Sequence, residues 1–162
     1  MTSPYKSENG SFEDPLENYV PPVFEDPVEQ ALHEELVSTL QTQPHCCVSA
    51  DTSVRDTMKL MVGRQIACVL VEEGERLVGV FGDRDVLDKV ALEYDDVIDR
   101  PVREVMSTSP VSVLDVDSAA KVLAIMAVSG YRHVPVTTTE GKTIGVVSPQ
   151  RMGHFLIGHL QS

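Results

Sequence analysis

The strongest constraint in this sequence is an internal repeat. Two stretches of the chain can be laid over each other with a shift of about 65 residues. Each predicts a short strand, a helix, two further strands and a second helix, and the first helix of each copy is expected to end at a glycine, Gly63 or Gly130. The correspondence covers roughly residues 40–160, so we expect two similar α/β units.

The first copy is predicted to contain strands over residues 46–49, 66–71 and 77–81. Its helices are predicted after the cap Asp51-Thr52-Ser53 and over residues 83–92. Their apolar residues recur with helical spacing and are expected to face inward. These residues are Val54, Met58, Met61 and Val62 in the first helix, and Val86, Leu87, Val90 and Ala91 in the second.

The second copy follows the same order, with strands predicted over residues 111–113, 133–136 and 144–147. The cap Asp117-Ser118 precedes its first helix, and Ser148-Pro149 starts a final helix that extends to about residue 160. The inward face of the first of these helices is expected to contain Ala119, Val122, Leu123 and Met126.

Residues 1–26 differ from the rest of the chain and are predicted to form an acidic, proline-containing arm. The arm contains its own repeat, because Phe12-Glu13-Asp14-Pro15 recurs twelve residues later as Phe24-Glu25-Asp26-Pro27. Two interpretations remain open. The motifs could be helix or turn starts, each anchored by a phenylalanine, or they could dock on a partner subunit.

Composition excludes several classes of function. Hydrophobic residues make up 42% and charged residues 23% of the chain, as in soluble globular proteins. The formal net charge of -12 repels nucleic acids and anionic lipids. We see neither an apolar run of about 18 residues, as a membrane span needs, nor a secretory signal, and therefore expect a cytoplasmic protein without nucleic-acid or membrane partners.

No arrangement of residues predicts catalysis or a metal site. The cysteines Cys46, Cys47 and Cys68 lack the spacing of zinc or redox motifs and are interpreted as small apolar residues on buried strands. His154 and His159 lie five residues apart, which does not place them as neighbouring ligands on a helix. The chain also lacks a nucleophile elbow and a phosphate-binding loop with lysine, so we expect no enzyme activity.

The two copies share motifs that occur in the same order. In the second copy they are Val102–Ser107, Pro110–Val113, Arg132–Val136 and Gly145–Ser148, and the first copy shows the same frame in Gly79–Asp85. In these motifs the copies resemble CBS repeats, and the pair resembles a stand-alone tandem CBS protein, or Bateman module. The resemblance covers about three quarters of the chain.

The resemblance implies an α/β (α+β) fold of two CBS repeats related by a pseudo-two-fold axis, here over residues 27–96 and 97–162. It also implies ligand clefts between the repeats for AMP, ADP, ATP or S-adenosylmethionine as a regulatory ligand, with no required cofactor. Members typically form homodimers and regulate an enzyme, channel or transporter. We expect any regulated partner of this chain to be a separate protein.

The family's ribose motif places a hydroxyl at the start of a helix and an aspartate one turn later. The first copy has Gly82 at the hydroxyl position and retains Asp85, whereas the second retains Ser148 and has Arg151 in place of the aspartate. Arginine is a donor only and cannot accept hydrogen bonds from a diol, although it can bind a phosphate. We therefore expect ribose in the Asp85 cleft, unless Asp85 is only an acid favoured by the helix dipole.

Other ligand positions are also implied by the resemblance. Arg132 and His133 occupy a position that often reaches phosphate oxygens, although they could instead cap the strand or pair with a nearby acid. Adenine would lie along the opening strand of a repeat. The residues there are Pro44, His45 and Cys46 in one copy and Ser109, Pro110 and Val111 in the other.

Two functions from different classes follow from these motifs. The chain is interpreted first as a regulatory module that senses an adenosine-type nucleotide in the cleft between its repeats. The alternative is a non-catalytic dimerisation or docking scaffold with degenerate ligand sites. Each ribose motif is only half intact, which keeps this alternative open.

Overall fold

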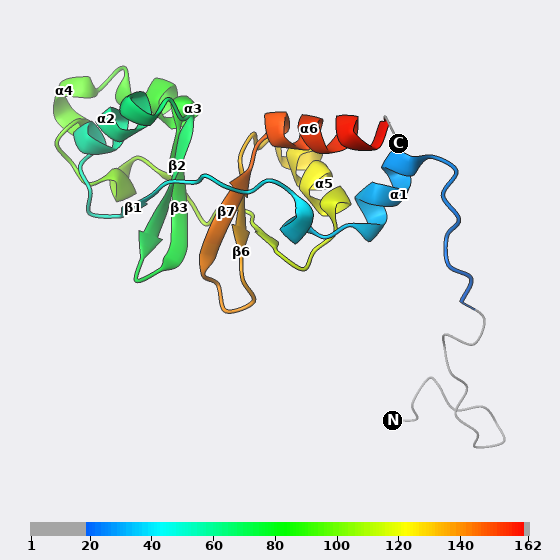
Figure 1. Ribbon diagram of the computed structural model, residues 1–162. Helices are drawn as coiled ribbons and strands as arrows, with labels where there is room; N and C mark the ends of the chain where they lie inside the picture. Colours follow the sequence, from blue (N-terminus) through cyan, green and yellow to red (C-terminus); the bar gives the residue numbers. More distant parts are fainter. Residues whose placement is uncertain (1–18, 161–162) are drawn as a thin grey trace, which may run out of the picture.

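Two α/β units lie side by side in the computed structural model, which describes residues 19–160 (Figure 1). The first sheet comprises β1 (Cys47–Ser49), β2 (Cys68–Glu73), β3 (Arg76–Gly82) and β4 (Ser107–Thr108), and the second comprises β5 (Val113–Leu114), β6 (Val134–Thr137) and β7 (Thr143–Val147). The strand order is β1-β2-β3-β4 in one sheet and β5-β6-β7 in the other. In both sheets a parallel pair is followed by an antiparallel pair, which confirms the predicted repetition and α/β class.

The long apolar run of the first copy forms a buried strand, as predicted. In β2, Val69 and Val71 are fully buried in the first core, and Leu70, on the opposite face, is buried against Val146 of the second unit. The strand begins at Cys68 and not at Ile66, because the Ile66 N–H donates to the Met61 carbonyl at 3.0 Å and still belongs to the end of the preceding helix.

Helix α2 (Val54–Arg64) begins at Ser53, as predicted, with the Ser53 hydroxyl accepting a hydrogen bond from the Asp56 N–H at 3.1 Å. Its predicted end at Gly63 is wrong. The helix continues to Arg64, and Gln65 ends it by adopting a left-handed φ of 53°. The prediction that Val62 faces inward is also wrong, because Val62 lies on the outer face and is 78% exposed.

The helix predicted over residues 83–92 is shorter and irregular. A single turn, α3 (Asp83–Asp85), passes into the π-helical segment η2 (Val86–Val90). A π-turn contains more residues than an α-turn, so the inward face departs from the predicted helical spacing. Val90 is buried and Val86 half-buried, as predicted, whereas Leu87 and Ala91 are exposed, contrary to prediction.

The second unit follows its prediction closely. Helix α5 (Ala119–Ser129) ends at Gly130, whose φ of 66° favours glycine, and α6 (Pro149–Leu160) begins after Ser148. The predicted opening strand is displaced, because β5 starts at Val113 and leaves Val111 exposed.

The N-terminal helix α1 (Pro27–Glu34) is capped by Asp26, whose carboxylate accepts a hydrogen bond from the Val28 N–H at 2.7 Å. Phe24 stacks on His33 of the same helix, with ring centroids 5.1 Å apart. The second Phe-Glu-Asp-Pro motif is therefore a helix start anchored by its phenylalanine. The first motif, at Phe12, lies outside the described residues. None of the helices within residues 19–160 is long and apolar enough to cross a membrane.

Each hydrophobic core includes a segment that precedes the other repeat. Helix α1 packs on α5 and α6, and the following turn, η1 (Val37–Thr39), buries Val37 in the second core. Conversely, the segment between the repeats completes the first core. It contains α4 (Tyr94–Val97) and η3 (Val102–Glu104), and it buries Val97, Ile98, Val102 and Val105. Each core therefore contains residues from both sides of the predicted boundary between residues 96 and 97.

Two glycines mark the places where the connecting segments cross the sheets. A Cβ at Gly145 in β7 would lie 2.5 Å from the Thr42 Cβ and 3.0 Å from the Thr42 carbonyl oxygen. A Cβ at Gly79 in β3 would lie 2.3 Å from the Met106 sulfur. The two contacts occupy corresponding positions of the repeats. Glycine is required there for close approach and not for backbone conformation.

We expect Gly145→Ala to lower the free energy of unfolding by about 1–3 kcal/mol, because the new methyl group overlaps backbone that cannot move freely. Gly79→Ala should cost less, since the Met106 side chain can rotate away. In Gly153→Ala, on α6, the new Cβ has no neighbour within 4 Å, and stability should rise by about 0.5–1 kcal/mol. Urea denaturation of the three variants measures this order, and equal effects at the three glycines would contradict it.

Candidate functional site

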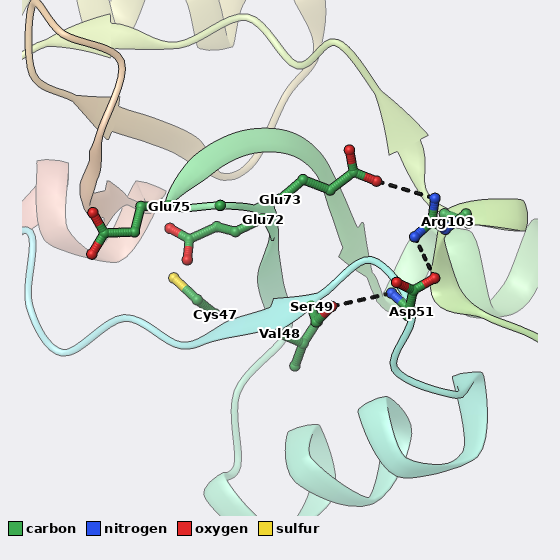
Figure 2. Close-up of a pocket in the computed structure, with 9 residues that line it drawn as sticks. Cys47, Val48, Ser49, Asp51, Glu72, Glu73, Glu75 and Arg103 are labelled. Atoms are coloured by element: carbon green, nitrogen blue, oxygen red, sulfur yellow. Dashed lines mark hydrogen bonds and ion pairs between the residues drawn. The ribbon is translucent and has the colours of Figure 1, made fainter.

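One cavity, of about 460 Å³, lies beside β1 and the turn between β2 and β3, and we call it the acidic cavity. Figure 2 shows Arg103 between Asp51 and Glu73, and it forms an ion pair with each of them. The carboxylates of Glu72 and Glu75 also belong to the lining. The lining holds four acids and one arginine that is already paired, so this cavity disfavours a phosphate-bearing ligand.

A second cavity, of about 410 Å³, lies between the two units, and we call it the inter-repeat cavity. Its volume falls in the range of small-molecule sites. Both repeats contribute to it, through the segment before β1, the start of β2, the entry to β6 and the junction of β7 with α6. The lining residues are Pro44, His45, Cys46, Gln65, Ile66, Ala67, Cys68, Leu70, His133, Val146, Ser148, Pro149, Gln150 and Arg151.

The polar end of the inter-repeat cavity is formed by Ser148 and Arg151 at the start of α6. The Arg151 N–H donates to the Ser148 hydroxyl at 3.4 Å. The Arg151 guanidinium donates to the Val146 carbonyl from Nη1 and to the Pro44 carbonyl from Nη2, each at 2.6 Å. Arg151 therefore ties the start of α6 to the segment that leads into β1.

Arg151 carries a charge that no acid neutralises within residues 19–160. Its two side-chain hydrogen bonds go to carbonyl groups, whereas Arg55, Arg100 and Arg103 each form an ion pair with a carboxylate. Burial lowers the pKa of the Arg151 guanidinium below its usual range, although arginine remains charged at neutral pH. The lining of the inter-repeat cavity contains no aspartate or glutamate among the described residues.

Two histidines lie in the same lining. Burial is the main cause that lowers the pKa of His133, and it also lowers the pKa of His45. Both imidazoles are therefore mainly neutral at pH 7. His45 Nδ1 lies 2.9 Å from the side-chain oxygen of Gln43 and is oriented by it. Arg151 thus provides the permanent positive charge of the cavity, and the histidines provide neutral donors or acceptors.

Two of the cysteines, Cys47 and Cys68, have thiols that are held in the protonated form. Burial raises the pKa of the Cys68 thiol to about 12, and the pKa of the Cys47 thiol is also raised to about 12, first by burial and then by Glu72. A thiol that stays protonated at neutral pH is a poor nucleophile and a poor metal ligand. Cys68 is a small residue on a buried strand, as predicted, whereas Cys47 is only half-buried on β1 and Cys46, also half-buried, precedes that strand.

Asp85, the predicted ribose ligand, is 8% exposed and already has several donors. Its Oδ2 accepts from the Gly82 N–H at 3.0 Å. Its Oδ1 accepts from Lys89 Nζ at 2.7 Å and from the Ser107 hydroxyl at 2.8 Å. These contacts join the start of α3 to β4. Asp85 therefore ties the first repeat to the segment that crosses its sheet, just as Arg151 ties the second repeat to the segment before β1. Neither of the two cavities includes Asp85 in its lining.

The structure brings together half of the predicted ligand positions. Pro44, His45, Cys46, His133, Ser148 and Arg151 all line the inter-repeat cavity, whereas Gly82, Asp85, Ser109, Pro110, Val111 and Arg132 do not. The sequence motifs missed the apolar residues from the first repeat. Ile66 and Ala67 occupy the positions in the first repeat that correspond to Arg132 and His133 in the second. The pseudo-symmetry of the repeats could have predicted that they lie opposite the second ribose motif.

We expect His133 to make the fold less stable in weak acid. In the unfolded chain His133 binds a proton near pH 6.5, whereas in the folded protein its pKa is lower. The free energy of unfolding is therefore unaffected by His133 above pH 6.5 and falls as the pH drops from 6.5 toward the lowered pKa. Urea unfolding at pH 7.5 and pH 5.5 should show a smaller loss for His133→Asn than for the wild type. An equal loss in both proteins would show that His133 does not contribute.

Comparison with known proteins identifies the architecture. The profile of the CBS domain family matches residues 37–92 and 102–152. A CBS domain-containing protein of Arabidopsis thaliana, CBSCBSPB1, is 31% identical over 115 residues, which cover 70% of this chain and 21% of that protein. This chain therefore spans about a fifth of the length of that relative.

Solved structures share the fold. The CBS domain protein PAE2072 from Pyrobaculum aerophilum, complexed with AMP, superposes with a TM-score of 0.68 at 21% identity and covers 79% of this chain and 100% of its own. The CBS domain pair of MJ0100, in complex with 5′-methylthioadenosine and S-adenosylmethionine, has a TM-score of 0.67 at 18% identity, with 76% and 97% covered. At these identities the likeness establishes the fold alone.

Proposed function

Because this chain belongs to the CBS domain family, we propose that it is a non-catalytic regulatory module that binds an adenosine-type compound in the inter-repeat cavity. The observation that carries the proposal is the lining of that cavity. Residues of both repeats surround a space of about 410 Å³ with an apolar wall and one polar end. A ligand held there touches both repeats at once.

The apolar wall suits a purine ring. Ile66, Leu70 and Val146 supply aliphatic surface, and Pro44 and Cys46 lie on the segment that enters β1. Burial of a flat ring against such side chains gives a favourable free energy of about 25 cal/mol per Å² of apolar surface removed from water. The neutral histidines and the Ser148 hydroxyl can then orient the base and the sugar.

Solved relatives support this ligand class. PAE2072 was crystallised with AMP, and the MJ0100 pair with 5′-methylthioadenosine and S-adenosylmethionine. Both proteins share the tandem fold, and their ligands have the adenosine group in common. The proposed ligand of this chain is accordingly defined by that group.

Regulation follows from the position of the cavity between the repeats. A ligand that contacts both units favours one relative arrangement of them over others, and only such a difference in affinity can couple binding to shape. The change would be passed to a separate regulated protein. Residues 19–23, which are exposed, and the outer helices offer surfaces for that contact.

Filling the cavity should abolish binding. We expect AMP at about 100 times its dissociation constant to stabilise the wild type by about 2.7 kcal/mol, and Ala67→Phe to remove this shift because the ring occupies the ligand's space. Ser49→Phe places the same ring in the acidic cavity and should leave the shift intact. Thermal unfolding with and without AMP, adenosine and S-adenosylmethionine provides the measurement.

Asp85→Ala distinguishes the two ribose motifs in the same assay. It should lower stability, because Lys89 and Ser107 lose their acceptor, but retain the ligand shift. Loss of the shift in Asp85→Ala, with its retention in Ala67→Phe, would assign the ligand to the Asp85 cleft. The absence of any shift in the wild type would favour the scaffold function.

The proposed active form is a homodimer. Corresponding helices of the two repeats carry large exposed apolar side chains, and Figure 1 shows α2, α3, α5 and α6 along one side of the molecule. These exposed residues are Val62, Leu87, Leu92, Val128, Ile157 and Leu160. Large exposed apolar side chains on outer helices favour an interface, and a symmetric pair of units suits a symmetric dimer.

We expect the wild type to sediment as a dimer and Leu87→Glu to shift it to monomer, because a charge is poorly tolerated at an apolar interface. Lys142→Glu, an exposed change of larger charge in the turn between β6 and β7, lies away from these helices and serves as a control that should not alter the mass (Figure 1). Analytical ultracentrifugation reports both masses. A monomeric wild type at micromolar concentration would rule out the dimer.

A further inference from the structure

The charge of the inter-repeat cavity is opposite to that of the chain as a whole. The protein has a formal net charge of -12, and the acidic cavity is lined by four carboxylates. The inter-repeat cavity, in contrast, combines Arg151 with two histidines and, within the described chain, no acid in its lining. Glu72 and Asp83 are near enough to act on His45 and His133, but neither belongs to the lining.

Arg151 is held at the polar end of this cavity by carbonyl groups. Its bonds to Val146 and Pro44 use two of the five N–H donors that a guanidinium offers. Carbonyls satisfy the donors but leave the positive charge unneutralised. A guanidinium that is half-buried and unpaired with an acid is a ready partner for an anionic group of a ligand.

We propose that Arg151 makes the inter-repeat cavity selective for phosphorylated adenosine compounds, such as AMP, over neutral or cationic ones, such as 5′-methylthioadenosine or S-adenosylmethionine. This inference rests on the proposed function. It goes further because the adenosine group alone does not distinguish between these ligands.

The selectivity arises because the Arg151 guanidinium, which bonds neutral carbonyl groups, can bond a charged phosphate instead. A phosphate supplies two charged acceptor oxygens at a spacing that the planar guanidinium can bind together, and the Ser148 hydroxyl is a further donor. A neutral ligand supplies no such acceptor. S-adenosylmethionine has one carboxylate, but its sulfonium and ammonium groups outweigh it, and this positive charge is unfavourable beside Arg151 in a partly buried site.

The test measures affinity by isothermal titration calorimetry at pH 8 and low salt. AMP, adenosine, 5′-methylthioadenosine and S-adenosylmethionine are titrated separately into the wild-type protein and into Arg151→Gln. The matched control is Arg103→Gln, which removes the same charge from the acidic cavity. It corrects for the change in the overall charge of the protein.

We expect the wild type to bind AMP about tenfold to a hundredfold more tightly than adenosine, as one charge-assisted interaction allows. Arg151→Gln should lose most of this ratio, because it weakens the binding of AMP more than that of adenosine. Arg103→Gln should keep the ratio. Added salt should weaken the binding of AMP more than that of adenosine, which tests the inference without any variant.

Other results would overturn the inference. Wild-type protein that binds adenosine or S-adenosylmethionine as tightly as AMP has no selectivity for phosphate, although the proposed function would stand. Equal losses for AMP and adenosine in Arg151→Gln would assign Arg151 a structural role only. Failure of every adenosine compound to bind would instead overturn the proposed function itself, and this inference with it.

Discussion

The structure depends on the crossing of two connecting segments over the two sheets. Thr42 lies against Gly145 and Met106 against Gly79, at contacts too close for any side chain on the glycine. The segment before each repeat thereby reaches the core of the other one. Val37 is buried in the second core and Val102 in the first. Neither repeat has a complete core by itself, so the two units should fold as one cooperative body.

The crossing segments also hold the start of the last helix in each repeat, and they do so through different side chains. Asp85 and Arg151 occupy corresponding positions at the start of the last helix of each repeat, and each ties that helix to the segment beside it. Asp85 accepts from Ser107, whereas Arg151 donates to Pro44. The same structural role is thus performed by opposite charges. The carboxylate is saturated and buried, and the guanidinium faces an open cavity with its charge unpaired.

The Pro44 contact links the cavity to the N-terminal part of the protein. Residues 41–46 connect η1, which is packed in the second core, to β1 in the first sheet. Three hydrogen bonds hold this segment to the second repeat, from Val146 to Thr42, from Gln43 to Ile144, and from Arg151 to Pro44. A ligand that draws Arg151 toward itself acts directly on the last of these bonds, and so on a segment shared by both units.

The sequence by itself determined the repeat, the order of its strands and several helix ends, because these depend on local spacing and on residues such as Ser53 and Gly130. It also identified both ribose motifs and their departures from the family pattern. It did not reveal the π-turn after Asp85, which turned Leu87 and Ala91 outward, because the energy of one helical turn depends on its packing.

Only the tertiary structure decided which motif faces a cavity. Asp85 has the chemistry of a ribose ligand, yet Lys89 and Ser107 already bind it, and Ser107 lies far along the chain. Arg151 departs from the motif, yet the fold places it beside Ile66, Ala67 and His133, on parts of the chain that only the crossing brings together. Local spacing fixes what a residue can bind, whereas the partners that compete for it are set by long-range packing.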